Sequence, residues 1–443
     1  MASDNFDPSA LLQVLSRATY LTELRIHWPD KDILNLFVPA GGTCFAAIFR
    51  ELRSLRRLQL GNVPPAAFKD LAAAVPNLTP HLRILEIISN HLEPIEFPHT
   101  LGAHLVHLSS LRIYYPDLTR PRWEPFRSVR HLFILWPESV PLSLHALAST
   151  FPSLRALYFG LGRPGRHVDP HAIPPSQEGV RAAALAFQAS GDGWPRLSVL
   201  STTTAAEAWM LGVACRVRAL RLGVYDAARH ATFVDVIARV RPTKVTIALE
   251  GAARCVQPQG ALSVFHSSAS SPEVVGHAAA NGAVTHAVVF MVVPSTQAEE
   301  AQGAPGIAEI IGSHLRHSRL SYLHVVVPPD ERLKGMIFMQ DERHIYPYAL
   351  RQHRQAQDQA QAVVDSDPSS HQEPSRFADI DIPLLVSSLA TAGCRLRTIA
   401  LTIAERGQSV WRIDRSVNRH AQMISRIMDP VLAKAVIAEE EHM

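Results

Sequence analysis

Residues 55–60 have the sequence LRRLQL, and the spacing of its three leucines decides the fold. Positions 1, 4 and 6 of this six-residue motif are apolar, and positions 2, 3 and 5 vary. The alternation at its end is typical of a short β-strand with one buried face. Copies start at residues 21, 55, 82, 108, 129, 154 and 217, and weaker copies start at residues 197, 242, 284, 320 and 396.

The clearest copies recur at the spacing of a repeat protein. Starts at residues 21, 55, 82, 108, 129 and 154 lie 34, 27, 26, 21 and 25 residues apart. Most of these intervals fall within the period of about 20–29 residues that leucine-rich repeats have. Each unit can bury its apolar edge only by stacking on its neighbours, so we expect one elongated array and not three compact domains.

Stretches with helical spacing of apolar residues separate the strand motifs. Helices are expected at residues 68–75, 144–151, 233–240 and 307–315. Three of these end next to Pro76, Pro152 or Pro242, and proline forces the residue before it out of the helical conformation. Alternating helices and strands predict the α/β class. The expected fold is an irregular leucine-rich-repeat-like solenoid, with a parallel sheet on its concave side and helices on its convex side.

The repeated motif resembles the divergent leucine-rich-repeat region of fungal F-box proteins, especially the mushroom-type families with irregular repeats and long insertions. The resemblance covers residues 11–401. It implies a substrate-recognition adaptor of the F-box type. Regular repeats place Asn or Cys three residues after the last apolar residue of the strand, and only Asn90 does so in this sequence. A recognisable F-box does not precede the repeats in this sequence.

The composition of the segments between motifs predicts the domain organisation. Residues 1–350 are expected to form the solenoid, with insertions at 160–193 and 256–282. The first insertion is rich in Gly and Pro and indicates a long surface loop. Residues 351–375 are rich in Gln, His, Asp and Ser and indicate a polar linker or disordered insertion. Residues 376–443 would be the last repeat and a helical cap, with helical spacing over residues 411–438 broken at Pro430.

Charge and apolar content exclude several classes of protein. The 443 residues carry 43 Lys and Arg against 40 Asp and Glu, a net charge of +3. Such a small charge gives little attraction to nucleic acid or to an anionic membrane. The most apolar run, residues 287–293, is far shorter than the ~20 residues of a membrane span. Four separated cysteines form no CxxC pair, and the first residues lack the features of a secretory signal. We expect a cytoplasmic or nuclear protein.

Motifs for cofactors and metals lack the context that their chemistry requires. Residues 160–165 match GxGxxG, but prolines follow where the helix that receives a pyrophosphate would start. The histidine groups, His314 with His317 and His167 with His171, have no third ligand at a recognisable spacing. We therefore expect no cofactor, no resident metal and no catalytic residues. An α/β enzyme whose site converges from distant positions is the alternative.

Arginine is frequent at position 2 of the motif. We expect these side chains at the solvent edge, where a long side chain covers apolar surface and keeps its charge hydrated. They would form a basic stripe on a nucleic-acid-binding protein, but the low net charge argues against that partner. The six are Arg56, Arg83, Arg130, Arg155, Arg218 and Arg397.

Positions 3 and 5 of the motif should be presented on the concave sheet face, because alternate strand residues point to opposite sides. Charges of both signs with aromatic residues are typical of protein interfaces. We therefore expect a non-catalytic interaction scaffold that binds a protein partner on this face. The presented set includes Glu23, Gln59, Glu86, His131, Tyr322 and His324. The protein-binding candidates are Arg25, Arg57, Arg112, Phe133, Tyr158 and Arg221.

Overall fold

The structure is a computed structural model, and its chain divides into two compact units. Unit 1 comprises residues 1–200 and 210–215, and unit 2 comprises residues 201–209 and 216–443. The structure describes residues 13–15, 17–27, 52–61, 81–88, 105–118, 124–136, 142–161, 176–250, 284–292, 311, 315, 318–327, 381–393, 395–403, 407–418 and 421–442. Three expected features lie outside these residues: the helix at 68–75, the insertion at 256–282 and the linker at 351–375.

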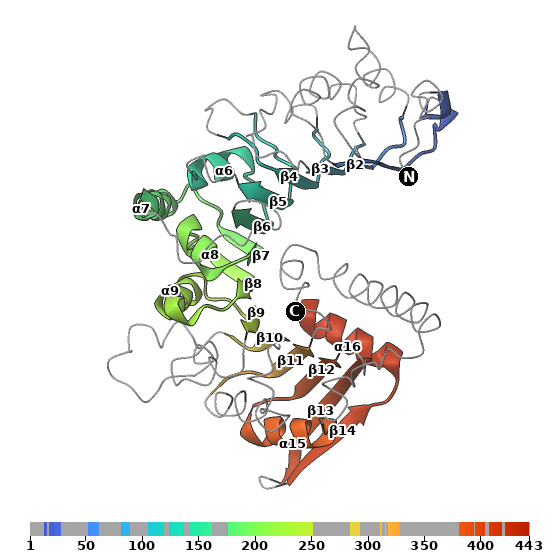
Figure 1. The fold of residues 1–443 in the computed structure, drawn as a ribbon, viewed down its shortest axis with the longest axis vertical. Helices are drawn as coiled ribbons and strands as arrows, with labels where there is room; N and C mark the ends of the chain where they lie inside the picture. The colour runs from blue at the N-terminus through green and yellow to red at the C-terminus, as the bar shows by residue number, and fades with distance from the viewer. Residues whose placement is uncertain are drawn as a thin grey trace, which may run out of the picture. The chain divides into compact units, whose positions relative to one another are not determined.

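The described strands form one sheet in which they follow the order of the sequence (Figure 1). The pairs from β1 to β6 and from β8 to β12 are parallel. The predicted α/β class with a mostly parallel sheet is therefore confirmed. The first seven strands are β1 (Glu23–His27), β2 (Arg57–Gly61), β3 (Ile84–Ile88), β4 (Ser110–Tyr114), β5 (His131–Trp136), β6 (Ala156–Leu161) and β7 (Arg196–Thr202).

Every copy of the motif coincides with a strand, and β1 to β6 each begin at position 3 of their copy. The two preceding residues belong to a turn. In the second copy the amide of Leu55 donates to the carbonyl of Leu52, 3.1 Å away, and both leucines are buried. The same turn joins Leu108 to Leu105 at 3.0 Å. Position 1 therefore anchors the turn in the core, and the strand starts only after it.

Positions 4 and 6 form the core of unit 1. The parallel register aligns position 4 of six strands into one file and position 6 into a second. Both files lie on the side of the strands away from positions 3 and 5. Leu58, Leu132 and Leu157 in the first file, and Leu60 and Ile134 in the second, have no exposed surface. Neighbouring strands thus bury each other's leucines, as the repeat pattern requires.

Two of the predicted helices are confirmed, with their ends at the expected prolines. α6 (Leu144–Thr150) begins after Ser143, whose side chain accepts from the amide of Ala146, and ends before Pro152. α9 (His230–Val240) ends at Arg241, which takes the left-handed conformation with φ of 47° directly before a proline. Of the helix expected at 307–315, the structure describes Ile311 and Leu315, which are helical and buried.

The insertion at 160–193 is not a loop throughout, which corrects the prediction. α7 (Ser176–Ala189) occupies its second half. The prolines that suggested a loop all precede residue 176, and the segment after them is rich in alanine, the residue with the highest helix propensity. Gly191, with φ of 86°, follows the helix end. The composition averaged over the whole insertion did not reveal the boundary between the proline-rich segment and the helix at residue 176.

The strands of unit 2 continue the parallel order and end in an antiparallel hairpin. They are β8 (Arg216–Val224), β9 (Lys244–Glu250), β10 (His286–Val292), β11 (Tyr322–Val327), β12 (Thr398–Ile403), β13 (Gly407–Asn418) and β14 (Ala421–Ile427). β13 pairs antiparallel with both β12 and β14. The helix expected from residue 411 is therefore wrong over β13 and β14. The spacing of Trp411, Ile413, Val417 and Ile424 suits an alternating strand as well as a helix.

Helix α16 (Pro430–His442) covers part of the sheet in unit 2. Asp429 accepts hydrogen bonds from the amides of Val431 and Leu432, so Pro430 starts this helix rather than breaking one. Ala433, Val436 and Ile437 pack against Tyr322, Ala400 and Val410 of β11, β12 and β13. Unit 2 also contains α15 (Ile382–Ala392), whose first turn is capped by Asp381. No helix of the described residues is long and apolar enough to cross a membrane.

Candidate functional site

Position 5 of the motif forms a continuous row across β1 to β6 in unit 1. The register places each member beside the next, and all point to one side because they occupy equivalent strand positions. Glu23 and Arg57 precede this row by two residues on their strands and share its side. We call this surface the polar face of unit 1. Its position 5 residues are Arg25, Gln59, Glu86, Arg112, Phe133 and Tyr158.

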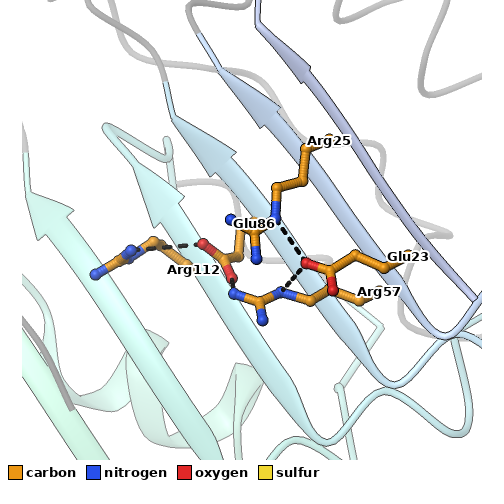
Figure 2. A network of polar contacts seen from close by, with 5 residues as sticks. All are labelled: Glu23, Arg25, Arg57, Glu86 and Arg112. Atoms are coloured by element: carbon orange, nitrogen blue, oxygen red, sulfur yellow. Dashed lines mark hydrogen bonds and ion pairs between the residues drawn. The ribbon is translucent and has the colours of Figure 1, made fainter. Parts of the chain in front are cut away.

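A chain of ion pairs runs along the polar face from β1 to β4 (Figure 2). Arg25 Nε lies 2.6 Å from Glu23 Oε1, and Arg57 Nε lies 3.5 Å from the same oxygen. Arg57 Nη2 also lies 2.6 Å from Glu86 Oε1, while Arg112 Nη1 lies 3.4 Å from Glu86 Oε2. Each glutamate therefore bridges two arginines.

Exposure changes along this chain of charges. The side chain of Arg25 is 61% exposed, whereas that of Glu86 is 9% exposed. The outer pair is worth little because water screens it, and the inner carboxylate depends more on its two partners. The hydrogen bond from Arg25 is the main cause that lowers the pKa of Glu23 below its ordinary value. These contacts hold the arginines in fixed positions on the sheet.

Aromatic side chains continue the polar face beyond the last ion pair. The guanidinium of Arg112 lies over the ring of Phe133, with its Cζ 4.2 Å from the ring centroid. Phe133 stacks on Tyr158 with centroids 6.3 Å apart and an angle of 21° between the rings. Tyr114 lies on its other side with centroids 5.9 Å apart, and burial raises the pKa of its hydroxyl. Arg112 thus joins the charged part of the face to the aromatic part.

Five of the six predicted protein-binding residues lie together on the polar face, and Arg221 does not. Of the five, Phe133 is only 8% exposed, so the expectation that it is presented to solvent is wrong. Arg221 occupies position 5 in unit 2 and is only 7% exposed, so the expectation that it is presented to solvent is wrong. Its row continues through Thr246, Val288 and His324, all of them buried. Glu86, Tyr322 and His324 are buried as well, which contradicts the same expectation for those three residues. Helix α16 packs on Tyr322 and Ala400 on this face of the sheet. The six-residue motif marks strands only, so it gave no sign that a helix covers the face here.

The structure adds Tyr114 to the predicted set and gives Glu23 and Glu86 a defined role. Both glutamates were expected on the face but not among the binding candidates, and they position the arginines that were. The sequence already contained a signal for these ion pairs. Opposite charges at positions 3 and 5 of neighbouring copies become cross-strand neighbours when the strands pair with equivalent positions aligned. Tyr114 follows position 6 of its copy, where the motif carries no information.

The described residues contain no metal-ligand cluster, and the thiol of their one cysteine is not activated. Among them, no group of three or more His, Cys, Asp or Glu side chains is placed to hold a metal ion. Burial raises the pKa of the Cys215 thiol to about 11, which keeps it protonated at neutral pH. Of the GxGxxG match only Gly160 and Leu161 are described, at the end of β6. His167, His171, His314 and His317 lie outside the described residues.

A scan against models of protein families found no match to this chain, and a search of curated proteins found none either.

Proposed function

We propose that the protein is a non-catalytic protein-interaction scaffold built from leucine-rich-repeat-like units, and that the polar face of unit 1 binds its partner. The row of position 5 residues carries the proposal, because it gathers arginines, a glutamate and two aromatic rings on neighbouring strands. Arginine and aromatic residues are enriched among the anchors of protein interfaces.

The dimensions of the polar face favour a macromolecular partner. Five spacings of about 4.8 Å separate β1 from β6, so the row is about 24 Å long. A folded domain or an extended peptide can contact the whole row, and a metabolite cannot. The ion pairs also hold the arginines in place before binding, which reduces the entropy lost when a partner immobilises them.

The resemblance to fungal F-box proteins supports a narrower form of the proposal. In that form the protein is a substrate-recognition adaptor of the F-box type for a ubiquitin ligase, located in the cytoplasm or nucleus. The partner would then be a substrate protein held on the polar face.

Affinity purification with quantitative mass spectrometry tests the proposal. The variant Arg25→Glu/Tyr158→Ala alters both ends of the polar face without removing a core residue. Its matched control is Arg239→Glu, since Arg239 is exposed and pairs with Asp235 at 2.9 Å, as Arg25 pairs with Glu23. The proposal predicts that specific proteins captured by the wild type are lost with the double variant and kept with the control. Identical capture by all three proteins contradicts it.

A further inference from the structure

Position 2 of the motif is held by the same backbone contact in successive copies. The carbonyl of Thr22 accepts from the amides of Arg56 and Arg57, at 2.8 and 3.0 Å. The carbonyl of Arg56 accepts in the same way from Arg83 and Ile84, also at 2.8 and 3.0 Å. This contact repeats through Arg83, Ser109, Arg130 and Arg155 in unit 1. Position 2 residues are therefore stacked one above another, at the strand spacing of about 4.8 Å.

Three copies in unit 2 show that this backbone contact does not require arginine, although Arg218 and Arg397 occupy position 2 in two other copies there. In the three copies, which are successive, position 2 is Thr243, Thr285 and Ser321. Their hydroxyls donate to the carbonyl of the preceding copy, at 3.0, 3.4 and 3.2 Å. Ser109 does the same in unit 1, donating to the carbonyl of Arg83 at 3.1 Å. A short hydroxyl side chain thus completes the ladder by itself, and arginine is not needed there for folding.

Unit 1 nevertheless has arginine at four of these positions. Arg56, Arg83, Arg130 and Arg155 are all exposed, and no described residue forms an ion pair or hydrogen bond with their guanidinium groups. The described residues of the turns that carry them contain one carboxylate, Glu124, against further arginines at 17, 53 and 127. We call the four position 2 residues the arginine ladder. No residue in the described part of the chain neutralises their charges, and an anion bound across them would do so.

We propose that the arginine ladder is a second binding site, separate from the polar face, and that it takes an acidic segment of a protein. From Arg56 to Arg155 there are four strand spacings, or about 19 Å. An extended chain covers that distance with about six residues, at about 3.3 Å each. Guanidinium groups bind carboxylates through paired hydrogen bonds, so a run of Asp and Glu matches the ladder in both charge and length.

The surroundings of the ladder favour a peptide over a nucleic acid. Proteins that bind single strands place aromatic side chains beside the basic groove, where bases stack. Phe126 and Phe151 in these turns are buried, and among the described turn residues the exposed rings are those of Tyr20, before the first strand, and of His81 and His107. Between Arg56 and Arg155 the described part of the ladder thus offers charge without an exposed Phe, Tyr or Trp side chain. This inference does not rest on the proposed function of the polar face, since the two sites share no residue.

Fluorescence anisotropy with a labelled oligoglutamate peptide of about ten residues, longer than the six that span the ladder, tests the proposal at low salt. The test variant is Arg56→Thr/Arg83→Thr/Arg130→Thr/Arg155→Thr, which installs the residue that two copies of unit 2 have at the same position. Its Kd should rise roughly tenfold or more, the equivalent of one charge-assisted hydrogen bond. The control Arg216→Thr/Arg218→Thr/Arg395→Thr/Arg397→Thr removes four exposed arginines from unit 2 and should bind as the wild type does.

Three results would overturn the proposal. They are failure of the wild type to bind the peptide, equal weakening in both variants, and tighter binding of a single-stranded oligothymidylate of equal charge, which would assign the ladder to nucleic acid. Circular dichroism with thermal melting checks that the variants are folded. Should the fourfold variant unfold, Arg56→Thr/Arg83→Thr replaces it, with Arg216→Thr/Arg218→Thr as its control and the same outcomes.

Discussion

At the scale of single residues, Glu86 determines how the polar face is organised. Its carboxylate contacts one arginine on each side, from β2 and from β4, while its side chain is only 9% exposed. A carboxylate so far removed from water is stable only when its charge is compensated. Glu86 was foreseen as a presented residue because it occupies position 5. That it is largely buried under two arginines follows from side-chain packing, which the period of the motif does not encode.

Replacing Glu86 should therefore lower the free energy of unfolding more than replacing Arg25 at the exposed end of the ion-pair chain. We expect Glu86→Gln to lower the free energy of unfolding by about 1–3 kcal/mol, because two part-buried arginines lose their shared anion. Arg25→Ala should change it by less than about 0.5 kcal/mol, since that pair is exposed. Urea unfolding of the two variants measures both values. Equal effects would show that the inner pairs are screened as strongly as the outer one.

Glu23 provides a prediction for pH. Its pKa is lowered in the folded protein, so its pairing stabilises the fold above the unfolded pKa and is lost as the pH falls through the lowered folded value. Arg25→Ala removes the largest cause and should raise the pKa of Glu23 towards the ordinary value of a glutamate. NMR titration of the side-chain carboxyl measures the change, and an unchanged pKa would assign the shift to Arg57 instead.

At the scale of elements, the sequence predicted strands better than it predicted helices. Each motif copy became a strand because its period of two and its buried positions agree with the final register. α7 was missed because its alanines follow a run of prolines, and composition was judged over the whole insertion. The hairpin of β13 and β14 was taken for a helix because its apolar spacing fits both periods. Asp429 followed by Pro430 was the available signal for the start of α16.

Two glycines should respond in opposite ways to alanine. A Cβ at Gly223 in β8 would collide with the backbone carbonyl of Thr203, and backbone cannot move aside easily. We expect Gly223→Ala to destabilise unit 2 by about 1–3 kcal/mol or more through overpacking. Gly179 in α7 has nothing within 4 Å of its Cβ position, so Gly179→Ala should stabilise by about 0.5–1 kcal/mol. Chemical denaturation distinguishes the two, and a neutral Gly223→Ala would contradict the close approach.

At the scale of the whole molecule, the sequence predicted the order of strands in the sheet but not which part of its face is open. Strand order followed because every copy of the motif buries positions 4 and 6 against the next copy. The exposure of position 5 did not follow, because it depends on elements distant in sequence. α16 packs on β11, β12 and β13 in unit 2, whereas Arg25 in unit 1 remains 61% exposed. Four binding candidates therefore keep at least part of their expected exposure, whereas Phe133 and Arg221 are buried.

A stack of this kind transmits damage mainly to neighbouring strands. Leu111 is 2% exposed in the file of position 4, and we expect Leu111→Ala to cost about 2–5 kcal/mol through the cavity it leaves. Amide hydrogen exchange should accelerate most in β3, β4 and β5. Leu384→Ala, at a side chain that is 58% exposed, is the control and should change stability by under about 0.5 kcal/mol. Uniform acceleration across unit 1 would instead indicate one cooperative block.

The sequential strand order also has a mechanical consequence. If unit 1 is held by its two ends and stretched, the tension reaches the outermost strand first, and its hydrogen bonds open one after another like a zipper. Each detached copy then releases the chain up to the next one, which is 21 to 34 residues for the copies that start between residues 21 and 154. At about 3.4 Å per residue that is roughly 70–120 Å of added length for each event. A force–extension trace should therefore show a series of small, unequal steps, and the length of each step would identify the strand that came away.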